Sequence, residues 1–314
     1  MADATILSAR GLVVRYGDLE AVKGLNLDVR RGQVIGLIGP DGAGKTSSLR
    51  VFAGLLRATV GTVDVLGRDA WSHRRALHHR LGYLAQRFAL YGDLTVDENV
   101  QFFALLLGVK DWRSRRDLLL ERVALSEFRD RQADRLSGGM KPKLALACSL
   151  MHSPDILLLD EPTTGVDPVT RREFWRLLAD LVAEGLTLVI ATPYLDEAER
   201  CSRVVLMHQG RVLADAPPAE LRNLLPGVIV EVAAHPRTLV TDALAGVPGV
   251  VNVQPFAARF HVRLAATEGA ADRIRKALER AGATVEEVRV IPAGLEDTFL
   301  HLTRRDQHAP GEAA

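Results

Sequence analysis

The hydrophobic pattern of the N-terminal part of the chain alternates between short apolar runs and stretches with helical spacing. Val34–Ile38, Ile156–Leu159 and Leu186–Ala191 are apolar, and Ile6–Val14 alternates enough to form a strand. Residues 169–184, which separate the second run from the third, have the spacing of a helix. Apolar strands separated by helices are typical of a parallel sheet covered on both faces. The pattern therefore predicts an α/β domain.

Residues from about 88 to 150 have a different pattern of apolar positions. Asp97–Leu107, Ser114–Leu125 and Met140–Met151 have helical spacing. We interpret this segment as a helical subdomain inserted between two parts of the sheet domain.

The pattern changes again after Pro226 and Gly227. Strands and helices then alternate in the order βαββαβ, at Val228–Val232, Arg237–Ala245, Val250–Gln254, Phe260–Leu264, Ala270–Ala281 and Val285–Ile291. This order is the signature of a small ferredoxin-like α+β domain. A short helix at Leu295–Leu302 follows, and the polar residues after it are expected to fray. We expect domains at 1–225 and 226–303, and a flexible tail at 304–314.

Composition narrows the class of protein. The 314 residues are 47% hydrophobic and 25% charged, which is ordinary globular usage. A formal net charge of +1 gives no general attraction to nucleic acid. Two cysteines, Cys148 and Cys201, cannot build a disulfide framework and favour a reducing compartment. No apolar run approaches the length of about 18 residues that spans a bilayer, so a membrane role must come through a partner.

A glycine-rich segment follows the apolar run Val34–Ile38 and precedes a helical stretch. Gly39–Thr46 fits the pattern G-x-x-x-x-G-K-[ST]. Backbone N–H groups of such a loop surround a β-phosphate, and the helix N-terminus adds its positive end. Lys45 would reach the β- and γ-phosphates, and Thr46 would offer its hydroxyl to Mg²⁺.

Two acids end the apolar run Ile156–Leu159. A buried strand that delivers Asp160 to its carboxyl end places this acid beside the phosphates, where it would hold Mg²⁺ directly or through water. Glu161 is then positioned to take a proton from the attacking water. Two exposed acids at a strand end would be the simpler interpretation without the phosphate loop upstream.

A third motif lies between the first two. Ser137, Gly138 and Gly139 open a helical stretch, and such a start makes another ring of outward N–H donors. A plain helix cap is the alternative. One cap does not need two glycines, so a second anion site is favoured.

The three motifs, in this order, resemble the ATPase subunit of ATP-binding cassette (ABC) transporters over about residues 6–225. The resemblance implies a P-loop NTPase cassette that binds ATP and Mg²⁺. It assigns Tyr16 to stacking on adenine and Val22 to packing against the nucleoside. Gln86 would touch Mg²⁺ and the attacking water and sense the membrane partner.

The resemblance also implies a dimer. Ser137–Gly139 would bind the γ-phosphate of ATP held by the opposite subunit, and Asp167 would cross the dimer interface. The predicted catalytic residues are Lys45, Gln86 and Glu161, and the predicted metal ligands are Thr46, Gln86 and Asp160. The predicted nucleotide contacts are Tyr16, Val22, Gly39, Pro40, Asp41, Gly42, Ala43, Gly44, Lys45, Thr46, Ser47, Ser137, Gly138, Gly139 and Asp167.

One position departs from the family pattern. The family's switch histidine corresponds to Pro193, which offers no side-chain donor and no backbone N–H to a γ-phosphate. We expect hydrolysis that is slower than in a histidine-bearing relative, or that depends on a partner cassette. Local compensation that leaves the rate unchanged is the alternative.

The functional hypothesis is the ATP-hydrolysing subunit of a membrane exporter of drugs, antibiotics or other amphipathic molecules. Its expected partners are transmembrane permease subunits and a second cassette, the same or related, with no nucleic acid. Its expected location is cytoplasmic, peripheral on the inner face of the cell membrane. An ATP-dependent clamp with weak or no hydrolysis, because of Pro193, is the alternative.

Two further segments extend the resemblance. Leu295–Leu300 is similar to a run that closes drug-exporting cassettes. Docking of Leu295, Phe299 and Leu302 on the C-terminal core is the favoured interpretation, and a regulatory or dimer-stabilising role of this domain is the alternative. Phe102, Phe103 and Leu105–Leu107 form an apolar stripe. Core packing is the favoured interpretation of the stripe, and a groove that receives a helix of the transmembrane partner is the alternative.

Overall fold

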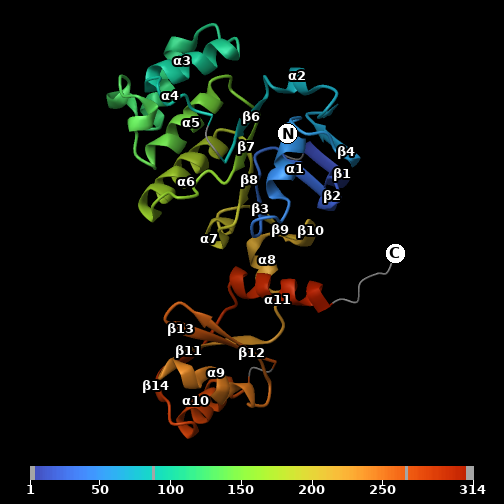
Figure 1. Cartoon of the computed structure of the whole chain (residues 1–314), viewed down its shortest axis with the longest axis vertical. Helices are drawn as coiled ribbons and strands as arrows, with labels where there is room; N and C mark the ends of the chain where they lie inside the picture. Colours follow the sequence, from blue (N-terminus) through green and yellow to red (C-terminus); the bar gives the residue numbers. More distant parts are fainter. Residues whose placement is uncertain (1–3, 87–88, 266–267, 309–314) are drawn as a thin grey trace. The chain divides into compact units, whose positions relative to one another are not determined.

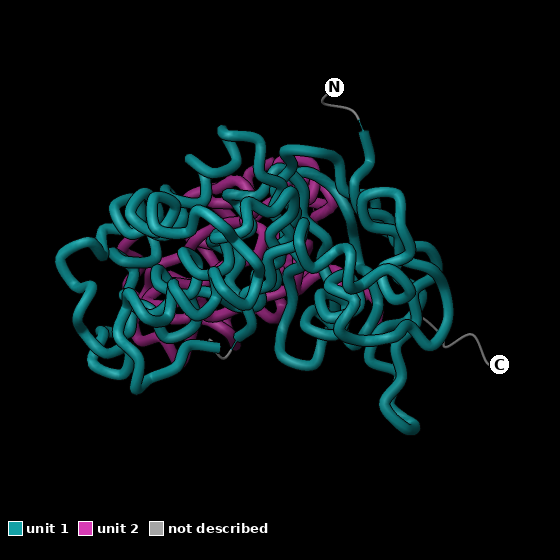
Figure 2. The backbone as a smooth tube through the Cα atoms, turned by 90° about the horizontal axis from the view of Figure 1, so that it is seen from above, with its two compact units in different colours: residues 1–217 teal, residues 218–314 magenta. Residues whose placement is uncertain are grey.

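The computed structural model describes residues 4–86, 89–265 and 268–308. Its elements form two units, Met1–Pro217 and Pro218–Ala314 (Figures 1 and 2). The first unit ends before the boundary predicted at residue 225. The reason is that α8 (Pro218–Arg222) contacts α11 (Leu295–His308) of the second unit.

The larger sheet of the first unit has six strands, and neighbouring strands run parallel except at one edge, where β9 and β10 are antiparallel. In sheet order they are β10 (Arg211–Ala216), β9 (Arg203–His208), β3 (Val34–Ile38), β8 (Thr187–Thr192), β7 (Ile156–Asp160) and β6 (Leu81–Leu84). This confirms the predicted parallel sheet. Its central strands β7 and β8 are buried at every position, as strands covered on both faces must be.

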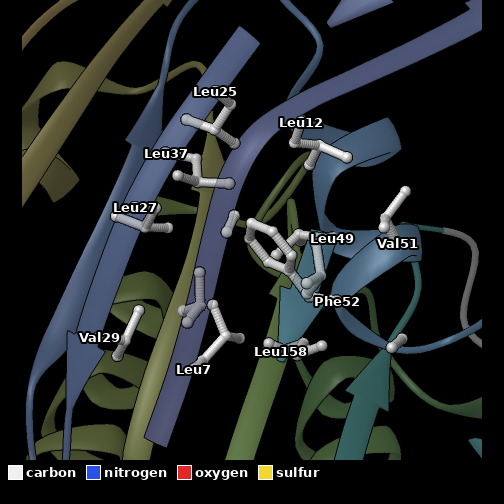
Figure 3. Packing of buried hydrophobic residues seen from close by; sticks show 14 of the residues in the cluster. Leu7, Leu12, Leu25, Leu27, Val29, Leu37, Leu49, Val51, Phe52 and Leu158 are labelled. Carbon is white, nitrogen blue, oxygen red and sulfur yellow. The ribbon is translucent and has the colours of Figure 1, made fainter. Parts of the chain in front are cut away.

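A second, antiparallel sheet of the first unit was not predicted. It has the order β2-β1-β4-β5, with β1 (Thr5–Tyr16), β2 (Leu19–Arg30), β4 (Val60–Val65) and β5 (Arg68–Asp69). Helix α1 (Lys45–Phe52) contacts strands of both sheets. Figure 3 shows Leu49 and Phe52 of α1 among Leu7 and Leu25 of the small sheet and Leu158 of the large one. This core fixes the start of α1 relative to the ends of the parallel strands.

The predicted helices between residues 88 and 150 are present as α3 (Val96–Leu106), α4 (Trp112–Arg122) and α5 (Met140–Leu150). A capping box starts α3, in which Thr95 and Glu98 each accept a hydrogen bond from the other's backbone N–H. Helix α6 (Pro168–Ala183) follows β7, and the short α2 (Arg74–Leu77) and α7 (Leu195–Ala198) lie in connections.

The apolar stripe on α3 corrects the favoured sequence interpretation. Phe102 is 36% exposed, Leu105 60% and Leu106 67%, so these three side chains are not core residues. The opposite side of α3, including Val100 and Ala104, is buried, and this helix packs on α4 and α5. Helical periodicity identifies an apolar face, but it does not tell a core face from a surface that awaits a partner.

The second unit has the predicted ferredoxin-like arrangement. Its antiparallel sheet has the order β12-β13-β11-β14, and two helices pack on one face. The elements are β11 (Val228–His235), α9 (Arg237–Ala245), β12 (Val250–Phe256), β13 (Arg259–Leu264), α10 (Ala270–Arg280) and β14 (Thr284–Ile291). Val230, Val262 and Ile274 are fully buried in the core between sheet and helices.

Helix α11 closes the second unit and is longer than predicted. It runs from Leu295 to His308, so the flexible tail predicted from residue 304 is wrong for residues 304–308, and residues 309–314 lie outside the described part. Leu295 is buried, whereas Phe299 and Leu302 are half-buried. Within the described residues, no helix has the length and apolar character needed to cross a bilayer.

Candidate active site

The glycine-rich loop connects β3 to α1 and is held tightly against its neighbours. Gly44 has φ +99° and caps α1, and a Cβ at this residue would lie 2.4 Å from the carbonyl oxygen of Ala21. A Cβ at Gly39 would lie 2.1 Å from the carbonyl oxygen of Met207. Both positions therefore need glycine, one for backbone conformation and both for the close approach of other strands.

Lys45 is held inside this loop. Its side chain is 4% exposed, and Nζ donates hydrogen bonds to the carbonyl oxygens of Gly39 at 2.8 Å and Pro40 at 3.0 Å. The same Nζ lies 3.5 Å from Oε1 of Glu161, whose side chain is also buried. The buried ammonium group thus has a compensating charge and two carbonyl partners, as a buried cation requires.

Asp160 ends β7 beside the first turn of α1. Thr46 Oγ1 donates to Asp160 Oδ1 at 2.8 Å, and Tyr83 of β6 donates its hydroxyl to Oδ2 at 3.2 Å. Burial raises the pKa of Asp160, and the hydrogen bonds from Thr46 and Tyr83 oppose the rise. Burial, together with the charge of Asp160, raises the pKa of Tyr83 to about 12. The carboxylate and hydroxyl oxygens are the donor set that a hard divalent cation prefers.

Glu161 follows Asp160 in a strained backbone conformation. Its φ is +50°, in the left-handed region, and its N–H donates to the carbonyl oxygen of Ala191 in β8 at 2.8 Å. Oε2 accepts hydrogen bonds from Gln86 Nε2 at 2.9 Å and from Thr164 Oγ1 at 3.3 Å. Strain of this kind persists where surrounding contacts over-determine it, and it is concentrated at functional sites.

Lys45, Thr46 and Glu161 border an open cavity of about 720 Å³, whereas the predicted site residues Gly39, Pro40 and Asp160 are not among its described lining residues. Tyr16, which is 44% exposed, lies at the cavity, and its hydroxyl is 3.3 Å from Ser47 Oγ. The predicted residues that line the cavity are Tyr16, Asp41, Gly42, Ala43, Gly44, Lys45, Thr46, Ser47, Gln86 and Glu161. Lining residues that the sequence analysis missed are Leu19, Glu20, Ala21, Lys23 and Gln209. The alternating pattern of Leu25, Leu27 and Val29 was the signal for the strand that carries most of them.

The structure corrects the prediction for Val22. Its side chain is fully buried in the core beneath the loop, against the position of Gly44, and it does not border the cavity. Lys23, the next residue along β2, is among the lining residues instead. Successive strand residues point to opposite faces, which separates these two side chains.

The third motif lies elsewhere in the unit. None of Ser137, Gly138 and Gly139 is among the described residues that line the cavity, and neither is Asp167. Ser137 and Gly138 are exposed, and Ser137 Oγ accepts a hydrogen bond from Met140 N at 3.3 Å at the start of α5. Gly139 packs on α6, since a Cβ there would lie 2.4 Å from Thr170 Cγ2. Close packing against Thr170 therefore accounts for a glycine at position 139.

Asp167 begins α6 next to this motif. Its carboxylate accepts hydrogen bonds from the backbone N–H groups of Val169 and Thr170, both at 3.0 Å. Hydrogen bonding from Thr170, first from its side chain, lowers the pKa of Asp167. The exposed carboxylate is thereby fixed as a helix cap beside the glycine pair.

Comparison with known proteins agrees with this geometry. The family model described as ABC transporter matches residues 22–164. The daunorubicin resistance ATP-binding protein DrrA3 of Streptomyces coeruleorubidus is 38% identical over 315 residues, which cover 98% of each chain. The chain belongs to the family of ABC transporter ATP-binding proteins.

Two other relatives are also named as ATP-binding proteins of transporters or export systems. The Nod factor export ATP-binding protein I of Ralstonia nicotianae is 37% identical over 96% of this chain and 94% of its own length. A probable multidrug ABC transporter ATP-binding protein of Escherichia coli, YbhF, is 42% identical over 220 residues, or 69% of this chain. That match spans only 38% of YbhF.

Solved ABC cassettes share the fold. The cbiO1 subunit from Clostridium perfringens superimposes with a TM-score of 0.65 at 27% identity, covering 78% of this chain and 97% of that one. A dimeric cassette, MJ0796 bound to ADP and Pi, has a TM-score of 0.62 at 25% identity and covers 68% and 98%. These likenesses confirm the predicted fold class, and neither they nor the relatives give support to a non-hydrolysing clamp.

The departure at Pro193 lies just after β8 in this ABC protein. Pro193 is half-buried, and the following N–H, of Tyr194, donates to Thr192 Oγ1 at 3.1 Å. The Arg171 guanidinium stands 4.2 Å from the centroid of the Tyr194 ring. Glu197, fully buried one turn later, accepts a short hydrogen bond from Thr163 Oγ1. The backbone around the switch position is therefore well anchored, although Pro193 itself offers no donor.

The glycine pair gives a direct test of the packing between α5 and α6. Gly139→Ala is expected to lower the free energy of unfolding of the nucleotide-free protein by about 1–3 kcal/mol, because the added methyl group overpacks Thr170. Gly138→Ala, whose Cβ meets nothing within 4 Å, is expected to stay within about 0.5 kcal/mol of the wild type. Urea denaturation followed by circular dichroism measures both values.

A second-site change serves as the control. Thr170→Ala removes the closest atom, Cγ2, and leaves Cβ at 3.1 Å, so Gly139→Ala should cost less in the Thr170→Ala background than in the wild type. Equal losses from Gly138→Ala and Gly139→Ala would contradict the packing assignment.

Proposed function

We propose that this chain is the ATP-hydrolysing subunit of a membrane exporter. The observation that carries the proposal is the convergence of Lys45, Thr46, Asp160, Glu161 and Gln86 at one edge of the parallel sheet. Relatives named for multidrug transport, daunorubicin resistance and Nod factor export support an amphipathic small molecule as cargo. The position of the exporter's ATPase is then peripheral, on the cytoplasmic face of the cell membrane.

The chemistry is phosphoryl transfer from ATP to water. Lys45, already poised inside the loop, changes partners from two backbone carbonyls to the β- and γ-phosphates when ATP enters. Glu161 takes a proton from the attacking water, and Gln86 and Thr164 hold its carboxylate in place. Tyr16 offers its ring to the adenine at the open side of the cavity.

Thr46 and Asp160 would hold Mg²⁺, with Gln86 as a further ligand. Bound Mg²⁺ neutralises charge on the β- and γ-phosphates. The hydroxyl group of Thr46 and the carboxylate of Asp160 are already in contact, and the Tyr83 hydroxyl fixes the second carboxylate oxygen. Tyr83 therefore positions a metal ligand from the neighbouring strand β6.

A complete site requires a second cassette. The chain has one phosphate loop, and its Ser137–Gly139 motif does not border the same cavity among the described residues. Ser137 and Gly138 are exposed with donors at a helix start, as a motif that meets another subunit's γ-phosphate must be. Two copies, or this chain and a related one, would enclose two ATP molecules, and the dimeric relative bound to ADP and Pi supports this arrangement.

A groove beside β6 suits a helix of the transmembrane partner. It has a volume of about 600 Å³, with an apolar wall that includes Phe103, Leu106 and Leu107. Arg75 adds a positive charge at the lining, and Ala85, next to Gln86 in the chain, also lines the groove. An occupant of this groove would therefore contact the segment that leads to Gln86.

Replacement of the general base tests the proposed reaction. Glu161→Gln is expected to lower ATP turnover by about 10²–10⁴-fold, because the amide cannot accept the proton. ATP binding should persist, and with Mg²⁺ and ATP the variant should elute as a dimer in size-exclusion chromatography. The exposed Glu184→Gln is the matched control and should keep wild-type turnover. Undiminished hydrolysis by Glu161→Gln would overturn the assignment.

The switch position gives a second test. Pro193→His is expected to raise kcat for ATP, since the new side chain supplies a donor for the γ-phosphate. Pro193→Ala restores only the backbone N–H and should remain at the wild-type rate. Steady-state ATPase assays of the three proteins distinguish the two effects, and equal rates for all three would show that Pro193 does not limit hydrolysis.

The groove is tested by membrane association. Leu106→Glu is expected to reduce recovery of the chain with membranes that contain its transmembrane subunits, because it places a charge on the apolar wall. Leu118→Glu, on the exposed side of α4, is the matched control and should be recovered normally. Basal ATPase activity of the isolated protein should not change. Normal recovery of Leu106→Glu would assign the partner to another surface.

A further inference from the structure

The second unit contains a cavity of about 240 Å³ between its sheet and α11. All of its lining residues belong to that unit, so the cavity is separate from the nucleotide site and does not depend on the proposed function. The residues are Leu225, Ile229, Asn252, Gln254, His261, Arg263, Asp297, Leu300, His301, Arg304 and Arg305.

The cavity exists because α11 covers a polar sheet face. On β13, Phe260, Val262 and Leu264 face the apolar core, which places His261 and Arg263 on the opposite face. A helix that packs on a sheet normally buries apolar side chains there. Here the covered surface instead carries ionisable and amide groups around open space.

Positive charge gathers at one end of this cavity. Arg263 comes from the sheet, and Arg304 and Arg305 come from the last turns of α11. Arg263 Nη1 lies 2.7 Å from His301 Nδ1, and a guanidinium group can only donate, so His301 is neutral with its proton on Nε2. Arg263 therefore meets a neutral ring at this contact.

The positively charged side chains around the cavity repel one another. Burial, and then the charge of Arg304, lowers the pKa of Arg263. Burial, followed by the charges of Arg263 and Arg305, lowers the pKa of His301. An anion placed among these groups would relieve the repulsion that they exert on one another.

The nearby carboxylates already have partners. Asp297 Oδ1 lies 2.9 Å from His261 Nδ1, and its Oδ2 accepts a hydrogen bond from Gly294 N at 3.0 Å. Glu231, on the same sheet face, accepts from Arg259 and Arg289 at 2.7 and 2.8 Å. Asp297, the acidic residue that lines the cavity, thus already has partners, and Glu231 is not among the described lining residues.

We propose that this cavity binds a phosphate group, carried by a small soluble molecule or by a lipid headgroup. Guanidinium groups present paired N–H donors that match phosphate oxygens, and Asn252 and Gln254 add amide donors. The volume equals that of about eight liquid waters at about 30 Å³ each, which suits a phosphate monoester with a short organic part.

The test uses the full-length chain with its nucleotide site saturated by ADP. Calorimetric titration with glycerol 3-phosphate is expected to show saturable binding, and uncharged glycerol is expected to show none. Flotation with phosphatidylcholine vesicles, with and without phosphatidic acid, is the second arm. Binding in the first arm identifies a soluble phosphate monoester, and binding only to phosphatidic acid vesicles identifies a lipid phosphate.

Charge-matched variants locate the binding. Arg263→Gln and Arg304→Gln are each expected to weaken it by at least about tenfold, because each removes a charge-assisted hydrogen bond. Arg280→Gln, on the exposed end of α10 and outside the cavity, changes the net charge equally and should bind normally. Arg304 is exposed, so its variant serves even if Arg263→Gln fails to fold. The proposal is overturned if neither probe binds, or if Arg280→Gln loses as much affinity as Arg304→Gln.

Discussion

The register of β8 between β3 and β7 is the constraint on which the active site depends. Ile38 pairs with Thr192, and Asp160 pairs with Ala191, so the carboxyl ends of the three strands lie side by side. Two hydrogen bonds continue this alignment past the strands, because the N–H groups of Gly39 and Glu161 donate to the carbonyl oxygens of Thr192 and Ala191. The phosphate loop, the acid pair and the switch position thereby meet at one edge.

This alignment places opposite charges in a buried setting before any nucleotide is present. Lys45 and Glu161 are each less than a tenth exposed and lie 3.5 Å apart. Loss of one partner of such a pair leaves the other charge uncompensated, at a typical cost of about 3–5 kcal/mol. Both residues line the cavity, so a nucleotide that enters it meets this charge pair directly.

Local motifs were predicted well from the sequence, and long-range arrangements were not. Gly39–Thr46 and Asp160–Glu161 were found because their function depends on neighbours in the chain. Val22 was assigned to the nucleoside by resemblance alone, and its side chain instead lies in the core beneath the loop, which only the packing of β2 reveals. Tyr83 was missed because its contact with Asp160 links strands far apart in sequence. The C-terminal fold was predictable from strand order, but the polar face beneath α11 became apparent only once that helix was placed.

Tyr83 also gives the proposed partner a physical path to the reaction. It lines the groove beside β6, and its hydroxyl donates to Asp160. Gln86, which holds Glu161, follows the same strand by two residues beyond its end at Leu84. A helix that binds the groove more tightly in one arrangement of β6 than in another would therefore shift both acids together. Coupling between a transmembrane partner and the nucleotide site requires such differential binding, and proximity alone does not provide it. Strand β6 is the element that borders the groove and also contacts the acid pair, through Tyr83 and the segment that leads to Gln86.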